Sequence, residues 1–268
     1  MKIFLISGSH PRHLHVHKEI INLGYETKAL VMNREEMLPS IPKGLPRIDV
    51  KNMKYHFNSR LKKEHDVYGD LLIKEIFRDI DYKMCSKDTM NTEENAEFIK
   101  QFNPNLVLVF GPTIIKDPIL SILPEDSINM HLGLSPQYKG AATLFWPFYY
   151  LEPQFAGVTF HKISKNVDAG GILHQCCPSL SHNDGIHDVS AKAVLCALED
   201  LKKIIYFKEK NSPFEYVQQK QTGKLFYASD FKPYHLRVIY NLFDNKIVNE
   251  YLDGNLSSNL PKLINFLI

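Results

Sequence analysis

Hydrophobic and polar positions alternate along the first part of the chain in a way that predicts strands separated by helices. Apolar runs at residues 3–7 and 25–32 predict two buried strands. The amphipathic segment between them, residues 14–23, predicts a helix that Gly24 ends. This alternation is typical of a parallel sheet with right-handed crossover connections.

The next part of the chain is less regular. Residues 33–58 are rich in Pro and Lys with little periodicity, which predicts a long loop or excursion. Residues 59–77 have helical apolar spacing, with Arg60 and Glu64 one turn apart. Residues 92–102 predict a further helix, because Glu, Ala, Phe and Ile recur there at helical intervals.

The middle of the chain holds the best candidate for a central strand. Residues 106–110 are entirely apolar, follow an Asn-Pro-Asn breaker and end at a glycine. Four elements follow: a helical turn at 119–123, strands at 127–131 and 155–163, and a long helix at 186–207. We therefore expect an α/β fold, a doubly wound and mostly parallel sheet with a small C-terminal appendage. Such sheets bind ligands at the carboxyl ends of their central strands.

The polar stretch at residues 208–230 predicts a domain boundary. We expect a catalytic domain at residues 1–207, and a linker with a small C-terminal segment at 208–268. A helix at 234–244 and an apolar stretch at 260–268 are predicted within that segment. Its aromatic content favours packing on the first domain, or on a second subunit of a homodimer.

Composition narrows the class of protein. The 268 residues, 44% hydrophobic and 23% charged, are those of an ordinary globular protein, and a net charge of +2 is too mild to indicate nucleic-acid binding. Four cysteines without a metal-binding spacing predict free thiols in a reducing compartment. No apolar run approaches the length of about eighteen residues that a membrane span needs, and the start is too short for a signal-peptide core. We expect a cytoplasmic protein with neither a membrane nor a nucleic-acid partner.

Three side chains with useful chemistry, Asn129, His131 and Asp168, follow one another closely in segments that can place them at strand ends. An amide can donate to an oxyanion, an imidazole can move protons near neutral pH, and a carboxylate can orient the imidazole and accept a proton. Formyl transfer to an amine needs that set. Each residue alone also has an ordinary interpretation, as a turn residue, a core histidine and a turn cap respectively.

The short sequence motifs around these residues resemble those of a known protein family. Leu-Ser-Pro-Gln-Tyr-Lys-Gly-Ala-Ala follows the Asn-x-His motif at residues 134–142, and Gly-Val-Thr-Phe-His stands at 157–161. In this order the chain resembles the folate-dependent formyltransferases, which include methionyl-tRNA formyltransferase, glycinamide ribonucleotide transformylase and the nucleotide-sugar N-formyltransferases. The resemblance is sharp over residues 104–175 and looser over the rest of 1–207. Gly171 departs from it, because several relatives carry an acidic residue there.

The resemblance implies a formyltransferase-type Rossmann-like domain, with 10-formyltetrahydrofolate as the formyl donor and no metal. It implies that Asn129 and His131 stabilise the tetrahedral oxyanion, while Asp168 accepts a proton and holds the tautomer of His131. It also implies that the loop after the central strand binds the pterin ring through its backbone, with an ordinary strand-to-helix loop as the alternative. The expected donor-binding residues are Gly111, Thr113, Ile114, Ile115 and Val167.

The loop after the first strand is a candidate site for the acceptor substrate. Ser9, His10 and Arg12 would suit an anionic group near the start of the first helix, and Lys139 is a further candidate. A purely structural turn is the alternative. His13, His15 and His17 invite a metal interpretation, but positions two apart do not share a helix face and no nearby Cys or Asp completes a ligand set. The aromatic run at 145–150 favours core packing over a stacking platform for a base.

The acceptor is the open question. The segment at 208–268 is short for an OB barrel that grips tRNA and lacks a dense basic face, yet glycinamide ribonucleotide transformylases usually stop after the first domain. We therefore expect a nucleotide-linked amino sugar for surface polysaccharide, with methionyl-tRNA or glycinamide ribonucleotide as alternatives. Two hypotheses from other functional classes remain. One is a hydrolase that releases formate from formyltetrahydrofolate, and the other is a non-catalytic binding protein with the same fold.

Overall fold

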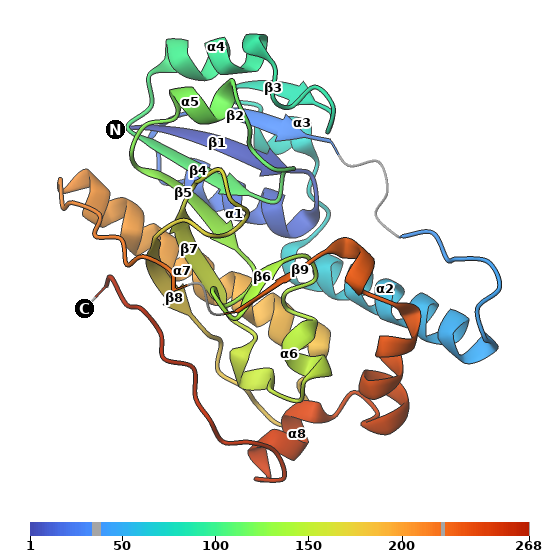
Figure 1. Cartoon of the computed structure of the whole chain (residues 1–268). Helices are drawn as coiled ribbons and strands as arrows, with labels where there is room; N and C mark the ends of the chain where they lie inside the picture. Colours follow the sequence, from blue (N-terminus) through green and yellow to red (C-terminus); the bar gives the residue numbers. More distant parts are fainter. Residues whose placement is uncertain (34–38, 221–222, 268) are drawn as a thin grey trace.

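Seven strands form one sheet through the middle of the computed structural model, which describes residues 1–33, 39–220 and 223–267 (Figure 1). The order across the sheet is β3-β2-β1-β4-β5-β7-β8. Strands β1 to β5 pair in parallel, whereas β7 and β8 are antiparallel additions at one edge. The strands are β1 (Lys2–Gly8), β2 (Glu26–Met32), β3 (Asp81–Cys85), β4 (Leu106–Phe110), β5 (Ser127–His131), β7 (Val158–Lys162) and β8 (Ile172–Cys176).

Helices cover both faces of this sheet, because its strands bury side chains on both sides. Along β1, Ile3 and Leu5 face one core cluster while Phe4 and Ile6 face the other. The first cluster lies under α1, α2 and α7, and the second under α4 and α5. The helices are α1 (Pro11–Ile21), α2 (Arg47–Tyr68), α3 (Ile73–Ile76), α4 (Glu93–Phe102), α5 (Ile119–Ile122), α6 (Trp146–Tyr149), α7 (Ile186–Glu209) and α8 (Ile247–Leu252).

Several predicted elements are confirmed. Strands β1, β2, β4, β5 and β7 and helices α1, α4, α5 and α7 lie where the periodicity placed them, within a few residues. The central strand β4 is fully buried, as its apolar run predicted. Thr92 caps α4 by accepting from the backbone of Asn95, which explains why that helix begins where it does.

The loop predicted for residues 33–58 was wrong from Arg47 onward, because α2 begins there; residues 34–38 lie outside the described part of the chain. Helix α2 escaped notice because its buried positions include the polar residues Asp49, Asn52 and His56. Those polar side chains form hydrogen bonds with residues far along the chain, so α2 lacks the apolar stripe that marks an ordinary amphipathic helix. The single helix predicted for 59–77 ends at Tyr68, where Gly69 takes a positive φ of 78°.

Strands β3 and β8 were not predicted either. In β3 most side chains are exposed or half-buried, so no apolar run marks it. In β8 the buried positions include His174 and Gln175, whose polar atoms bond to the C-terminal tail at Phe266 and Ile264. Local pattern carries no signal for a strand whose buried polar groups are paired so far away in sequence.

The C-terminal segment packs on the first domain, one of the two arrangements expected. Its elements are β9 (Lys224–Phe226), short 3₁₀ turns at Ala228–Asp230 and Pro233–His235, a π-helical turn at Val238–Leu242, and α8. Another 3₁₀ turn, at Pro153–Phe155, belongs to the first domain. The helix predicted for 234–244 is therefore divided, and it ends early because Asp244 and Asn245 take positive φ values. Strand β9 pairs in parallel with β6 (Tyr138–Gly140) in a second, small sheet.

Polar pairs connect the C-terminal segment to α2. Arg237 donates two hydrogen bonds of 2.7 Å to the carboxylate of Asp49, and Asn52 donates to Asn241 at 2.7 Å. Ile239 is fully buried in the same core cluster as α7. No helix within the described residues is both long and apolar enough to cross a membrane.

Replacing Ile239 by Ala should lower the free energy of unfolding by about 2–5 kcal/mol, the cost of removing a buried aliphatic side chain. Urea unfolding followed by the fluorescence of Trp146 should show one transition, shifted to lower urea. Leu242→Ala is the matched control, because the side chain of Leu242 is 72% exposed and its loss should cost little. A separate early transition, with the main one unchanged, would contradict a core shared between the two parts.

Candidate functional site

The site forms where parallel strands β4 and β5 end at the same edge of the sheet. Along β5, Ile128 and Met130 face the core, so Asn129 and His131 must face the other side together. Antiparallel β7 lies beside β5, with His161 directly opposite Asn129. Strand alternation alone therefore brings an amide and two imidazoles to one side of the sheet.

Asp168 reaches this group from the loop between β7 and β8. The loop is closed at its base, because the Lys162 backbone donates to Gly171 at 2.8 Å. A side chain at Gly170 would lie 1.8 Å from the Lys162 carbonyl, so this close turn needs glycine. Asp168 itself takes a positive φ of 47°, which Asp tolerates better than most residues.

The three expected catalytic side chains converge, as predicted. The Asp168 carboxylate lies 3.3 Å from Nδ1 of His131 and 3.4 Å from Nδ2 of Asn129. It also accepts from the backbone N–H of Gly140 at 2.9 Å. The carboxylate is mostly buried, and these contacts replace the water that it loses.

Two acceptors fix the protonation of His131. Its Nε2 lies 2.9 Å from the Tyr138 carbonyl, an acceptor only, so Nε2 must carry a hydrogen. Nδ1 faces the Asp168 carboxylate, so a proton there would also have a partner. Gly133 permits this arrangement, because a Cβ at residue 133 would lie 2.7 Å from Nε2 of His131.

Burial lowers the pKa of His131 more than the nearby Asp168 carboxylate raises it, so the ring is neutral near pH 7. Burial by itself would raise the pKa of Asp168. Electrostatic interaction with His131, the hydrogen bond to His161 and the hydrogen bond from the Gly140 N–H outweigh that effect and hold the pKa of Asp168 at about 2. Asp168 is thus an anion at neutral pH, beside a neutral ring with one vacant nitrogen.

His161 is a member of this group that sequence reasoning missed. Its Nε2 lies 3.1 Å from Nδ2 of Asn129 and 3.3 Å from Oδ1 of Asp168. Its Nδ1 donates to the Lys162 carbonyl at 3.0 Å, and its Nε2 faces both the Asn129 amide and the Asp168 carboxylate. The motif Gly-Val-Thr-Phe-His could have indicated this role for His161, because alternation along β7 puts His161 opposite Asn129.

A cavity of about 480 Å³ opens beside these side chains. Its lining includes Asn129, His131, His161 and Asp168, and also all five residues expected to bind the donor: Gly111, Thr113, Ile114, Ile115 and Val167. Asn91 fixes the loop after β4 by donating to the Ile114 carbonyl and accepting from the Lys116 backbone. An apolar wall with a polar, hydrogen-bonding end is the usual form of a small-molecule site.

A second cavity, of about 570 Å³, adjoins the first and shares lining residues with it, among them Leu132 and Thr143. His10 and Arg12 line the second cavity, whereas Ser9 and Lys139 line neither. Arg12 forms a close ion pair with Glu64 of α2. The loop after β1 therefore does contribute to a cavity, but its cation is already engaged by a carboxylate.

The three histidines of α1 lie in different surroundings. His13 packs edge-on against Phe110, with ring centroids 4.5 Å apart. His17 is buried, and burial lowers its pKa to about 3. His15 packs against Tyr68. The rings therefore serve packing on α1.

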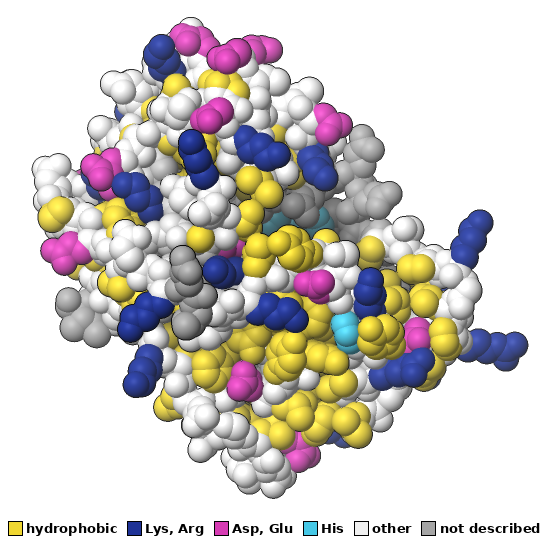
Figure 2. Space-filling model, in the orientation of Figure 1, with side chains coloured by type: hydrophobic (Ala, Val, Ile, Leu, Met, Phe, Trp, Pro, Cys, Tyr) yellow, Lys and Arg dark blue, Asp and Glu magenta, His cyan; other side chains and the backbone are white. Residues whose placement is uncertain are grey.

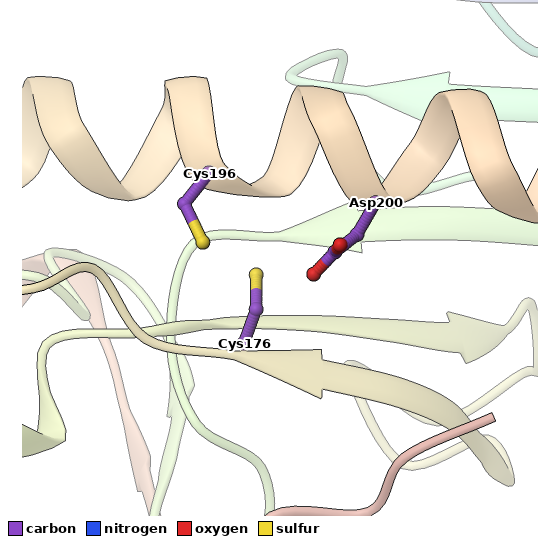
Figure 3. A group of neighbouring side chains, drawn as sticks. All are labelled: Cys176, Cys196 and Asp200. Carbon is purple, nitrogen blue, oxygen red and sulfur yellow. The ribbon is translucent and has the colours of Figure 1, made fainter. Parts of the chain in front are cut away.

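Another cluster brings together Cys176 of β8 with Cys196 and Asp200 of α7, which point toward one another across the strand and helix (Figure 3). Their ligand atoms lie within 4.8 Å of one another. Both Asp200 oxygens already accept hydrogen bonds, from His174 at 3.0 Å and from Lys203 at 2.9 Å. A cation would have to displace Lys203, so we assign the cluster no metal. All four cysteines are free thiols.

Comparisons with known proteins give a family match and a shared fold. The family model described as formyl transferase matches residues 59–208, a range that contains Asn129, His131 and Asp168. Methionyl-tRNA formyltransferase of Thermodesulfovibrio yellowstonii is 28% identical over 179 residues, which cover 66% of this chain and 56% of that protein. The chain thus spans little more than half the length of this curated relative.

Solved structures of formyltransferases share the fold. The N-formyltransferase from Helicobacter canadensis, in complex with folinic acid and dTDP-3-aminofucose, has a TM-score of 0.58 and 20% identity, over 99% of this chain and 85% of that one. Phosphoribosylglycinamide formyltransferase from Anaplasma phagocytophilum has a TM-score of 0.56 and 14% identity, over 84% of this chain and 96% of that one. At sequence identities this low, the structural similarity establishes a common fold alone.

The pKa of His131 tests the electrostatics of the site directly. Titration by ¹H–¹⁵N NMR should give a pKa below the ordinary value of about 6.5, with the proton of the neutral ring on Nε2. Asp168→Asn should lower that pKa further, because the carboxylate is what raises it. Asp253→Asn, at an exposed site, should leave it unchanged. A neutral ring protonated on Nδ1, or a pKa that rises in Asp168→Asn, would contradict this geometry.

Proposed function

Because this chain belongs to the formyl transferase family, we propose that it transfers a formyl group from 10-formyltetrahydrofolate to the amine of a nucleotide-linked amino sugar. The observation that carries the proposal is the convergence of Asn129, His131 and Asp168 on one cavity. An amide donor, a neutral imidazole and a buried anion are together suited to acyl transfer to an amine.

The donor fits the first cavity. The loop after β4 supplies apolar walls at Ile114 and Ile115 for a flat ring, and backbone groups for its polar edge. The formyl group would then lie at the polar end. There the hydrogen bond from Nδ2 of Asn129 to Asp168 is long, at 3.4 Å, so Asn129 can exchange it for a hydrogen bond to the formyl oxygen while the Gly140 N–H still holds the carboxylate.

His131 is the better proton acceptor of the pair. A carboxylate with a pKa of about 2 is a weak base, whereas the neutral ring has a vacant Nδ1 beside it. As the amine attacks the formyl carbon, its proton passes to Nδ1, directly or through Asp168. Both N–H groups of the imidazolium are then paired, with Asp168 and with the Tyr138 carbonyl. The new C–N bond forms, the bond to the folate nitrogen breaks, and that nitrogen takes the proton back.

The acceptor fits the second cavity, which adjoins the first. The described lining holds the guanidinium groups of Arg12 and Arg60 together with the carboxylate of Glu64, which pairs closely with Arg12 and lies 3.9 Å from Arg60, so the charge of these three side chains is net positive. Phe231, a half-buried aromatic side chain of the lining, offers a ring face for a base. An anion and an aromatic base on one small molecule describe a nucleotide. The structure from Helicobacter canadensis, which carries dTDP-3-aminofucose, adds support from the same fold.

The homodimer belongs to the proposal as well. Figure 2 shows hydrophobic side chains gathered on the face that carries α6 and β9. Tyr150, Tyr227 and Tyr234 are each about half exposed within the described surface. Covering such a face with a second copy would remove apolar area from water, and we propose this side of the C-terminal segment as the dimer surface. A cytoplasmic role in polysaccharide synthesis would follow from the proposed acceptor.

Incubation with 10-formyltetrahydrofolate and a panel of acceptors, read by mass spectrometry, tests the function. A nucleotide amino sugar should gain one formyl group, and His131→Ala should slow this by about 10²–10³-fold or more. His182→Ala, at an exposed site, is the control. Formylation of methionyl-tRNA or glycinamide ribonucleotide instead would move the assignment within the family. Formate release without an acceptor would indicate a hydrolase.

The second cavity has its own test. Arg60→Ala should raise the acceptor KM about tenfold or more, the loss expected for a charge-assisted contact, with a much smaller effect on the folate KM. Arg78→Ala removes an exposed guanidinium and should change neither constant. An acceptor KM unchanged in Arg60→Ala would place the anion elsewhere, while formyl transfer itself would stand.

A further inference from the structure

The chain that follows α7 returns across the loop that carries Asp168. We call residues 216–219 and 224–226 the strap. Val217 of the strap pairs with Ile172 at the start of β8, each backbone N–H donating to the other's carbonyl at 2.8 Å. The strap is thereby attached to the element that directly follows the Asp168 loop.

Gln219 of the strap contacts the Asp168 loop itself. Its Nε2 donates to the Asp168 carbonyl at 2.8 Å and to the Gly170 carbonyl at 2.7 Å. Both partners can only accept, so the orientation of the amide is fixed. Its Oε1 is buried with no hydrogen-bond partner among the described residues, an unfavourable arrangement that the other end of the amide must offset. The amide therefore closes the loop at the residue whose carboxylate faces His131.

Gly171 explains how the strap can lie so close. A Cβ at residue 171 would stand 2.8 Å from Cβ of Tyr216 and 3.4 Å from Nε2 of Gln218. A larger side chain there would push the strap away from the loop. The absence of a side chain at Gly171 thus permits the contact that Gln219 makes.

The other part of the strap supports β6, which holds two groups of the site. Strand β9 pairs with β6, and Phe226 stacks on Tyr138 and Trp146 with ring centroids 6.0 and 4.6 Å away. Strand β6 supplies both the Gly140 N–H that binds the Asp168 carboxylate and the Tyr138 carbonyl that binds His131. The strap thus supports the main chain at Asp168 and, through β6, two of the groups that hold Asp168 and His131 in place.

We propose that Gln219 is a positioning residue, which holds the main chain at Asp168 so that its carboxylate stays between His131 and Gly140. Its kinetic consequence rests on the proposed function. Without the two hydrogen bonds the loop is free to shift, and a displacement on the order of 1 Å in a catalytic group can cost about 10²-fold in rate. Neither the strap nor the Asp168 loop lines the second cavity, so binding of the acceptor is largely spared.

Gln219→Ala should lower kcat about 10–100-fold while the acceptor KM changes less than about threefold. Gln218→Ala, the exposed neighbour, is the control and should keep the wild-type constants. Thermal unfolding of both variants shows whether either has simply lost its fold. A folded Gln219→Ala enzyme with wild-type kcat would overturn the proposal.

Gln219→Glu adds a readout that general destabilisation would not produce. At neutral pH the carboxylate would face two carbonyl oxygens, and only the protonated acid could donate to one of them. The ratio of variant kcat to wild-type kcat should therefore rise as pH falls from about 8 to about 5. A ratio independent of pH would contradict the hydrogen-bonding role.

The pKa of His131 decides the matter without any activity. Since Asp168 raises this pKa, displacement of the carboxylate in Gln219→Ala should lower it, whereas Gln218→Ala should not. If the wild-type protein transferred no formyl group, the proposed function would fail and this titration would still judge the strap. An unchanged pKa of His131 in Gln219→Ala would show that the strap does not position Asp168.

Discussion

The geometry of the site depends on one buried carboxylate. Asp168 stays ionised away from water only because the Gly140 N–H, the Asn129 amide, His131 and His161 surround it. These partners come from β5, β6 and β7 and meet Asp168 on a loop, so the carboxylate connects four separate pieces of chain. Its low pKa makes it an orienting anion, and the neutral His131 beside it becomes the group that can take a proton.

Much of the fold could be predicted because its signals are local. The apolar run of β4 and the amphipathic α7 identify themselves by burial periodicity, and the expected doubly wound sheet is the one observed. The failures share a physical cause. Helix α2 buries polar side chains such as Asp49, whose partner Arg237 is far along the chain, and β8 buries Gln175 against the tail. The periodicity of apolar residues predicts buried apolar faces. It cannot predict a helix or strand whose buried side chains are polar and hydrogen-bonded to residues far along the chain.

The site divides along the same line. Asn129, His131 and Asp168 could be identified from the sequence because they lie close together along the chain and are flanked by recognisable motifs. His161 could have been found by alternation along β7, whereas nothing local announces Gln219, which reaches Asp168 through tertiary packing. Arg12 was expected to bind an anion, but the ion pair with Glu64 depends on where α2 packs. Reactive side chains that lie in a contiguous motif can be identified from the sequence. The residues that position those side chains mostly cannot, because they are brought close only by tertiary packing.

The central claim is that the cavity beside His131 receives the formyl end of the folate. The most direct measurement uses folinic acid, a stable formyl folate, carrying ¹³C in its formyl group. Bound to the protein, its formyl proton should show nuclear Overhauser effects to the ring protons of His131 and to the side-chain amide of Asn129. Effects only to residues of the second cavity, such as Phe231, or no saturable binding at all, would contradict the account.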